Sequence, residues 1–283
     1  MYNVPMKIIG NKNALHTPEF HKKKQTERRI RGALISVVVL ITIIVPIFVL
    51  RNSHFLITSI EIKGNVVTKS EELESIITDD LAGNYLWVIP RSSTFLYPRT
   101  KIQNDLMERE PRLKFAQVSL LNPKSLSLSI AERTPSALYC KDISDVFSPV
   151  NCYFLDSSGY IFSEAPAFSG GVYFVYSSDP NLETSLRSQY LESKKFLEID
   201  AFIKSLADIG LYPKVFVFTH EEYHLILSNG AVIMWKETQN LNQIYSNLSS
   251  FVKDSNFQKD KNNLSNIQYI DLRFGNKIFY KYR

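Results

Sequence analysis

The chain has 283 residues, 45% hydrophobic and 12% aromatic, and this composition excludes a disordered or low-complexity protein. Its formal net charge of +5 is concentrated at the N-terminus, because residues 1–31 hold eight Lys and Arg against two Glu. A basic arm of this kind can bind nucleic acid. The apolar segment that follows it favours a tail beside a membrane instead, and we expect no nucleic-acid partner.

Residues 32–50 form an uncharged apolar segment of 19 residues. A helix of this length, at about 1.5 Å per residue, spans roughly 28 Å, close to the thickness of the bilayer's hydrocarbon core. A cleaved signal peptide would have a shorter apolar region and a small-residue exit, which residues 50–53 do not supply. Basic residues crowd the N-terminal flank, so the positive-inside rule predicts a cytoplasmic tail over 1–31, one transmembrane helix over 32–50 and an exported remainder.

The elements after the apolar segment alternate between strands and helices. In chain order we expect a strand at 57–63, helices from about residue 70 and at 100–109, and strands at 115–121 and 125–130. The helices are expected to bury Leu73, Ile76, Ile77, Ile102 and Leu106. The order β-α-α-β-β predicts an α+β layer of two helices on a three-stranded sheet. This layout resembles a POTRA domain, with expected bounds 55–132.

Residues 133–283 read as a second, β-rich extracytoplasmic domain that contains two helices. A hairpin is expected at Asp156–Gly159, followed by a strand at 172–176. Apolar residues at helical spacing predict helices around 196–206 and 241–251. Between these helices, Asn229-Gly230 separates two apolar runs and predicts a hairpin with a type I′ turn.

Cys140 and Cys152 are the two cysteines of the chain. In an exported region their simplest use is a disulfide that closes a short loop, since oxidising compartments maintain such bonds. Two small buried thiols are the alternative. Export favours the disulfide.

Residues 220–224 match the H-E-x-x-H pattern of zinc metalloproteases. The pattern holds zinc only on a helix, where residues four apart share one face. Here the flanking runs predict strands, and extended backbone would separate His220 from His224 by roughly 13 Å. The strand prediction thus disfavours zinc binding, and a membrane-tethered zinc hydrolase using His220, Glu221 and His224 is kept only as an alternative function. We expect no enzyme activity, metal or cofactor.

The C-terminal strand, residues 277–283, has no later element to cover it. An exposed edge strand is protected by charge or by a partner. Its lysines can provide that protection alone, or a partner segment can add a strand to this edge by β-augmentation.

Three passages carry a resemblance to a known family. Residues 122–137 resemble the "NP-x-x-L-x-I-x-I-x-E-R-x-P-x-A" passage that closes the POTRA domain of the bacterial FtsQ/DivIB cell-division proteins. Residues 155–162 are similar to that family's "L-I-D-x-x-G-x-x-F" hairpin, and residues 269–274 to its "Y-I/V-D-L-R-Y/F" strand. The order of tail, membrane helix, POTRA domain and β-rich domain is the same.

The resemblance implies a non-catalytic scaffold in the bacterial inner membrane at the division septum. It would hold FtsB-like and FtsL-like proteins by its C-terminal edge and contact other division proteins through the POTRA domain. The implied partner-binding residues are Arg273, Phe274, Lys277, Ile278, Phe279 and Tyr280, with Arg273 meeting an acidic group of the partner. The third reading, a POTRA protein of outer-membrane assembly or secretion, would require a long series of barrel strands after the POTRA domain.

Overall fold

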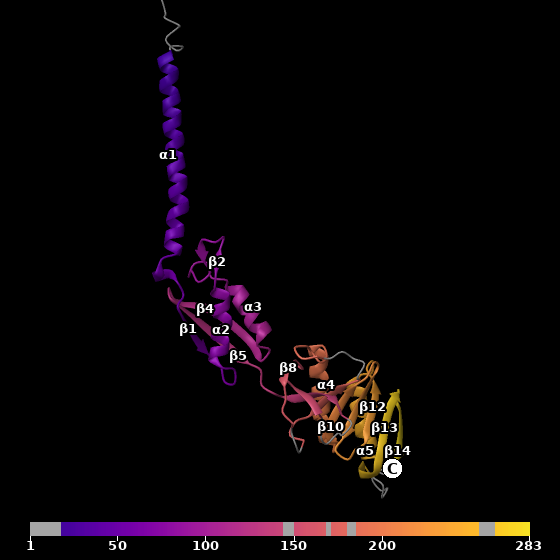
Figure 1. Cartoon of the computed structure of the whole chain (residues 1–283). Helices are drawn as coiled ribbons and strands as arrows, with labels where there is room; N and C mark the ends of the chain where they lie inside the picture. Colours follow the sequence, from indigo (N-terminus) through magenta and orange to yellow (C-terminus); the bar gives the residue numbers. More distant parts are fainter. Residues whose placement is uncertain (1–17, 144–149, 168–170, 180–184, 255–263) are drawn as a thin grey trace, which may run out of the picture. The chain divides into compact units, whose positions relative to one another are not determined.

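The computed structural model describes residues 18–143, 150–167, 171–179, 185–254 and 264–283. It is a mixed α+β structure with one long N-terminal helix (Figure 1). The chain divides into two compact units. One holds the residues up to Lys63 with Glu71–Gln103 and Val118–Leu128, and the other holds Gly64–Ser70, Asn104–Gln117 and Ser129–Arg283.

Helix α1 (Pro18–Leu50) includes the expected apolar segment. Its stretch Lys22–Leu50 is long and apolar enough to cross a membrane, and no residue of its most apolar window is buried inside the protein. Pro46 lies within the helix, where its missing N–H removes one backbone hydrogen bond. The part of the expected tail before Pro18 lies outside the described residues.

A three-stranded sheet has the order β1-β5-β4. Its strands are β1 (Ser59–Lys63), β4 (Leu113–Asn122) and β5 (Ser125–Glu132). Helices α2 (Ser70–Leu81) and α3 (Arg99–Arg109) follow β1 in the chain. The five helical residues expected to face inward are all buried. A short 3-10 helix η2 (Ser53–Phe55) precedes β1, and a small hairpin of β2 (Asn84–Tyr85) and β3 (Ile89–Pro90) lies between the helices in sequence.

A nine-stranded mixed sheet has the order β14-β13-β12-β11-β10-β9-β6-β7-β8. Its strands are β6 (Ala137–Asp142), β7 (Val150–Leu155), β8 (Ile161–Glu164), β9 (Val175–Ser178), β10 (Pro213–Phe218), β11 (Glu222–Leu227), β12 (Val232–Lys236), β13 (Ile267–Phe274) and β14 (Lys277–Tyr282). The expected hairpin before residue 162 is formed by β7 and β8, which pair antiparallel.

Two helices connect parallel neighbours in this sheet. Helix α4 (Ser193–Ser205), extended by the 3-10 helix η3 (Leu206–Ile209), connects β9 to β10. Helix α5 (Leu241–Lys253) and the 3-10 helix η4 (Leu264–Asn266) connect β12 to β13. Both helices contribute to the same core, which contains Tyr176, Phe196, Phe216, Trp235 and Leu248. A smaller cluster, Leu138, Cys140, Val175 and Val215, comes from alternate strand positions, which point to the opposite face.

Strand β9 lies between two parallel neighbours, β6 and β10, and its four residues are buried. The expected strand over 172–176 therefore begins and ends too early. Phe174 packs beside the core before the ladder begins, and the ladder continues through Ser177 and Ser178, whose polarity hid them from an apolar pattern.

The hairpin at Asn229-Gly230 is confirmed, but the expected type I′ turn is wrong. Of the two residues only Gly230 has positive φ, at 80°. Its N–H donates to the carbonyl of Leu227, and the N–H of Leu227 donates to Ala231. This is the three-residue loop in which a type I turn precedes a left-handed glycine.

Candidate interaction edge

Strand β14 forms one edge of the nine-stranded sheet (Figure 1). It pairs antiparallel with β13, and no strand of the described residues lies on its other side. The two strands are joined by Gly275-Asn276, with φ of 70° at Gly275. Glycine at the first central position is typical of a type II′ turn, whose twist matches that of the flanking strands. The sequence therefore ends this sheet in a tight hairpin with an outer strand.

Two aromatic side chains are exposed beside the turn. Phe274 is 58% exposed and Phe279 is 50% exposed. Their rings contact each other edge to face, with centroids 5.3 Å apart. Phe274 belongs to β13 and Phe279 to β14, so the pair lies across the hairpin. This exposed aromatic pair makes the hairpin the candidate interaction surface of this unit.

The opposite face of β14 contacts the core of its own unit. Ile278 and Tyr282 pack against the main core, so Ile278 is only partly accessible. Tyr280 lies against Phe251 of α5, with ring centroids 5.0 Å apart, and remains 46% exposed. The six implied partner-binding residues thus lie on one hairpin, but they do not share one face. Phe274 and Phe279 form the more accessible apolar group.

Arg273 is engaged by two carboxylates of its own chain. Its Nη1 donates to Glu222 Oε2 at 2.8 Å, and its Nη2 donates to Asp271 Oδ2 at 2.7 Å. Hydrogen bonding to Asp271 and then to Glu222 raises the pKa of Arg273, and the same contact lowers the pKa of Asp271. The meeting of Arg273 with an acidic partner group stays a prediction. In the free chain that group would compete with Glu222.

The H-E-x-x-H segment does not form a helix. His220 precedes β11 and His224 lies inside it, where it pairs with Met234 of β12. The arrangement that would bring both imidazoles to one zinc ion is therefore absent. Among the described residues no group of three His, Cys, Asp or Glu side chains is placed to hold a metal ion.

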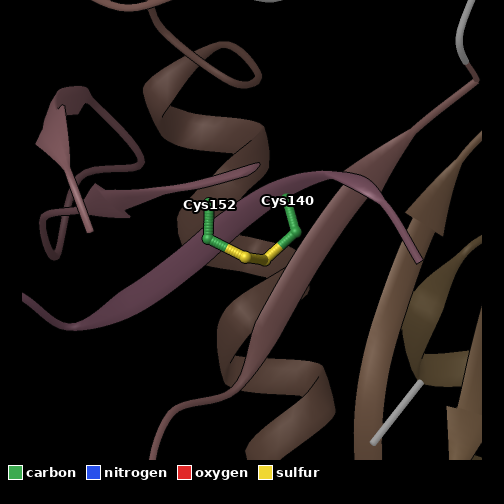
Figure 2. The surroundings of a disulfide bond; sticks show 2 residues. All are labelled: Cys140 and Cys152. Carbon is green, nitrogen blue, oxygen red and sulfur yellow. A yellow bond between two sulfur atoms is a disulfide. The ribbon is translucent and has the colours of Figure 1, made fainter. Parts of the chain in front are cut away.

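A disulfide joins Cys140 and Cys152 (Figure 2). The two residues face each other directly on the antiparallel strands β6 and β7, with Cα atoms 4.1 Å apart. Cys140 is fully buried and belongs to the smaller cluster, with Cys152 packed against it. The bond thus cross-links neighbouring strands on the face opposite the main core.

Two adjacent residues, Glu132 and Arg133, have structural roles that sequence reasoning did not assign. The Glu132 carboxylate accepts hydrogen bonds from the backbone N–H groups of Val66, Val67 and Thr68 at 2.9–3.2 Å. Burial opposes its ionisation, but the three N–H donors outweigh that effect and lower the pKa of Glu132. The sequence did offer a signal for these roles, because Glu132 and Arg133 form a charged pair directly after an alternating strand, where specific contacts are expected.

Arg133 forms an ion pair with Asp156, and its guanidinium lies 4.0 Å from the centre of the Tyr160 ring. Asp156 also accepts hydrogen bonds from the backbone N–H of Ser158 at 2.8 Å and of Tyr160 at 3.1 Å. Two of the passages that carry the family resemblance are therefore in direct contact. When the sequence is compared with known proteins, no family model and no curated protein matches it, so the inference of function rests on these residues.

Proposed function

We propose that this chain is a membrane-anchored, non-catalytic scaffold of the FtsQ/DivIB type. It holds an FtsB-like and an FtsL-like division protein outside the membrane and links them to septal peptidoglycan synthesis. Helix α1 anchors it in the bacterial inner membrane with its N-terminus in the cytoplasm. The proposal draws on the three sequence passages and on the order of elements after α1.

The observation that carries the proposal is the β13–β14 hairpin. A strand at the edge of a sheet can accept a further strand from a partner, with backbone hydrogen bonds supplying affinity. Phe274 and Phe279 supply exposed apolar surface beside that edge. Lys277 and Lys281 flank it and disfavour pairing between copies of the chain. The hairpin thus has the features expected of a selective β-augmentation site.

The order β1, α2, α3, β4 and β5 supports the assignment of a POTRA domain. In the proposed scaffold this domain contacts other division proteins. The β2–β3 hairpin is an addition to that order.

The test is a pull-down of division proteins with the tagged full-length chain from mild detergent extract, read by mass spectrometry. Phe279→Asp places a charge in the exposed patch. Leu197→Asp is its matched control, because Leu197 lies on α4 and is 51% exposed, against 50% for Phe279. Ile278→Pro removes one backbone N–H from β14. Circular dichroism checks that each variant folds.

We expect the intact chain and Leu197→Asp to retain FtsB-like and FtsL-like proteins, and Phe279→Asp and Ile278→Pro to lose them. If all four chains retain these proteins, the hairpin is not the binding site. If none of the four chains retains them, the proposal that the chain binds FtsB-like and FtsL-like proteins is refuted as well.

A further inference from the structure

The hairpin of β2 and β3 has two large apolar residues at its tip, where smaller residues are usual. Tyr85 pairs with Ile89, and the N–H of Val88 donates to the carbonyl of Tyr85 at 3.1 Å. The two central residues of this turn, Leu86 and Trp87, both have positive φ, at 46° and 67°. Such a turn is typical of Asn-Gly, because positive φ is unfavourable for residues with bulky side chains. The chain therefore maintains backbone strain to present these two residues, and strain of this kind points to function.

Both side chains project into solvent. Leu86 is 85% exposed and Trp87 is 95% exposed. The second tryptophan of the chain, Trp235, is by contrast fully buried in the nine-stranded sheet. A strained turn that exposes an indole and a leucine gains nothing from its own fold. An apolar environment for these two side chains would have to come from outside the chain.

The hairpin belongs to the same compact unit as α1, and it lies beside the end of that helix. Arg51 directly follows α1, and its Nη1 lies 3.5 Å from the carbonyl oxygen of Val88. After the hairpin, the N–H of Thr94 donates to the carbonyl of Phe55 at 2.9 Å, and the carbonyl of Ser92 accepts from Ile57 at 2.8 Å. These bonds tie the hairpin to the segment that leaves α1.

We propose that Leu86 and Trp87 insert into the interfacial layer of the membrane at the C-terminal end of α1. The inference rests on the proposed membrane span of that helix. Tryptophan is enriched at the boundary between headgroups and acyl chains, where its ring is apolar and its N–H is hydrated. A helix that ends in the same boundary holds the hairpin within reach of it. The insertion would give the unit a second contact with the bilayer and restrict its rotation about α1.

Positive charge beside the tip fits a lipid surface. Arg51 stands between α1 and the hairpin, and Arg91 follows β3, with its guanidinium 5.6 Å from the centre of the Tyr85 ring. Arginines at a membrane interface interact with lipid phosphates while their aliphatic stems lie along apolar surface. A partner protein could also cover Leu86 and Trp87. The contact between the hairpin and the end of α1 favours lipid as the cover of these side chains, and the experiment below distinguishes lipid from a partner protein.

The experiment uses the full-length chain reconstituted in phosphatidylcholine and phosphatidylglycerol vesicles. The chain has two tryptophans, so the emission of Trp87 is obtained by subtracting the spectrum of Trp87→Phe, which retains buried Trp235. Quenching is measured with lipids brominated near the headgroup, with lipids brominated deep in the acyl chain, and with aqueous iodide. Flotation after alkaline extraction establishes separately that α1 is inserted in each sample.

We expect lipids brominated near the headgroup to remove most of the Trp87 emission, deep bromines to remove less, and iodide to have little effect. Strong quenching by iodide with no effect of brominated lipids would overturn the inference. Insensitivity to both would also overturn it, because the indole would then be covered by protein. Failure of flotation would refute the membrane span of α1 instead. Leu86→Asn, which relieves strain in the turn, should fold normally and reduce the quenching by brominated lipid.

Discussion

Arg133 and Asp156 form a nearly buried ion pair, with side chains 13% and 5% exposed. Arg133 directly follows β5, and Asp156 begins the turn between β7 and β8. The contact joins the Glu-Arg-x-Pro passage to the Leu-Asp-x-x-Gly passage. Each supplies a group that the other requires, because a buried charge is stable only when it is paired and hydrogen-bonded.

We expect Asp156→Asn to lower the free energy of unfolding by about 3 kcal/mol, because it leaves the Arg133 guanidinium buried without its carboxylate. The amide oxygen can still accept the N–H groups of Ser158 and Tyr160, so the turn itself should persist. Urea unfolding followed by circular dichroism measures the change. A loss well under 1 kcal/mol would mean that the pair does not stabilise this junction.

Glu132, Asp156 and Asp271 all have lowered pKa values in the folded chain. A carboxyl group with a folded pKa below its unfolded pKa contributes full stability above the unfolded value, about 4. That contribution is lost as the pH falls through the folded value. We therefore expect the free energy of unfolding to be nearly constant from neutral pH to about pH 5 and to decline below about pH 4.

Glu132→Gln should reduce stability at neutral pH by about 2 kcal/mol, because three N–H groups lose a charged acceptor. The deficit should shrink as the pH falls, since the intact carboxyl group then becomes protonated as well. Urea unfolding of both chains across this pH range checks the convergence. A constant difference at every pH would assign the effect to packing rather than charge.

Removal of the disulfide by Cys140→Ala with Cys152→Ala should lower the free energy of unfolding by about 3 kcal/mol in the chain-entropy model. The comparison is between the variant and the intact chain under non-reducing conditions. Thiol titration of the denatured, non-reduced intact chain should find no free thiol. Two free thiols in that titration would contradict the bond.

Glu222→Gln tests the implied role of Arg273. The change removes a competing carboxylate from Arg273 but leaves Asp271 to hold the guanidinium. If a partner's acidic group meets Arg273, affinity for the proposed FtsB-like partner should rise by a few-fold, as expected for a partly exposed ion pair. Titration of the purified partner measures it. Unchanged affinity would indicate that Arg273 acts only within its own chain.

Gly64→Ala and Gly83→Ala form a matched pair, because both glycines have positive φ, at 92° and 84°. A Cβ at Gly64 would lie 2.2 Å from the carbonyl oxygen of Ile130, whereas a Cβ at Gly83 would meet nothing within 4 Å. Gly83→Ala should therefore lower the free energy of unfolding by about 1 kcal/mol, from the backbone alone. Gly64→Ala should lower it by about 3 kcal/mol or more, because backbone must move. If urea unfolding shows equal losses of unfolding free energy for the two variants, the predicted steric clash at Gly64 is contradicted.

Periodicity predicted the elements whose local pattern is strong. The helices that bury Leu73 and Ile102 and the hairpins at residues 156–159 and 229–230 are examples. Periodicity cannot predict which distant strands pair, because the apolar pattern of a buried strand is the same whichever strand lies next to it. The pairing of β9 with β6 therefore had no sequence signal, whereas the order strand, helix, strand at β9, α4 and β10 is typical of a parallel pair.

Turn geometry was less predictable than the turns themselves. At Asn229 the side-chain oxygen accepts the N–H of Ala231, and the amide nitrogen donates to the carbonyl of Leu264. These bonds stabilise a conformation other than the type I′ turn that Asn-Gly usually favours. The hairpin tip at Leu86-Trp87 was not foreseen for the converse reason, since its residues are unfavourable for the turn that they form.

Strand β9 has a consequence for how the second unit acquires its structure. Within the described sheet it alone joins the block β6–β8 to the block β10–β14, and it has only four residues. The block β6–β8 is built from hairpins, and the block β10–β14 from hairpins and the α5 crossover. Strand β9 must instead pair on both sides, with β10 across the α4 crossover and with β6 across the intervening strands β7 and β8, and such non-local pairing is slow. Until then β6 and β10 each present an open edge able to pair with another chain. We therefore expect a newly synthesised chain to be most vulnerable to aggregation in the period before β9 is inserted.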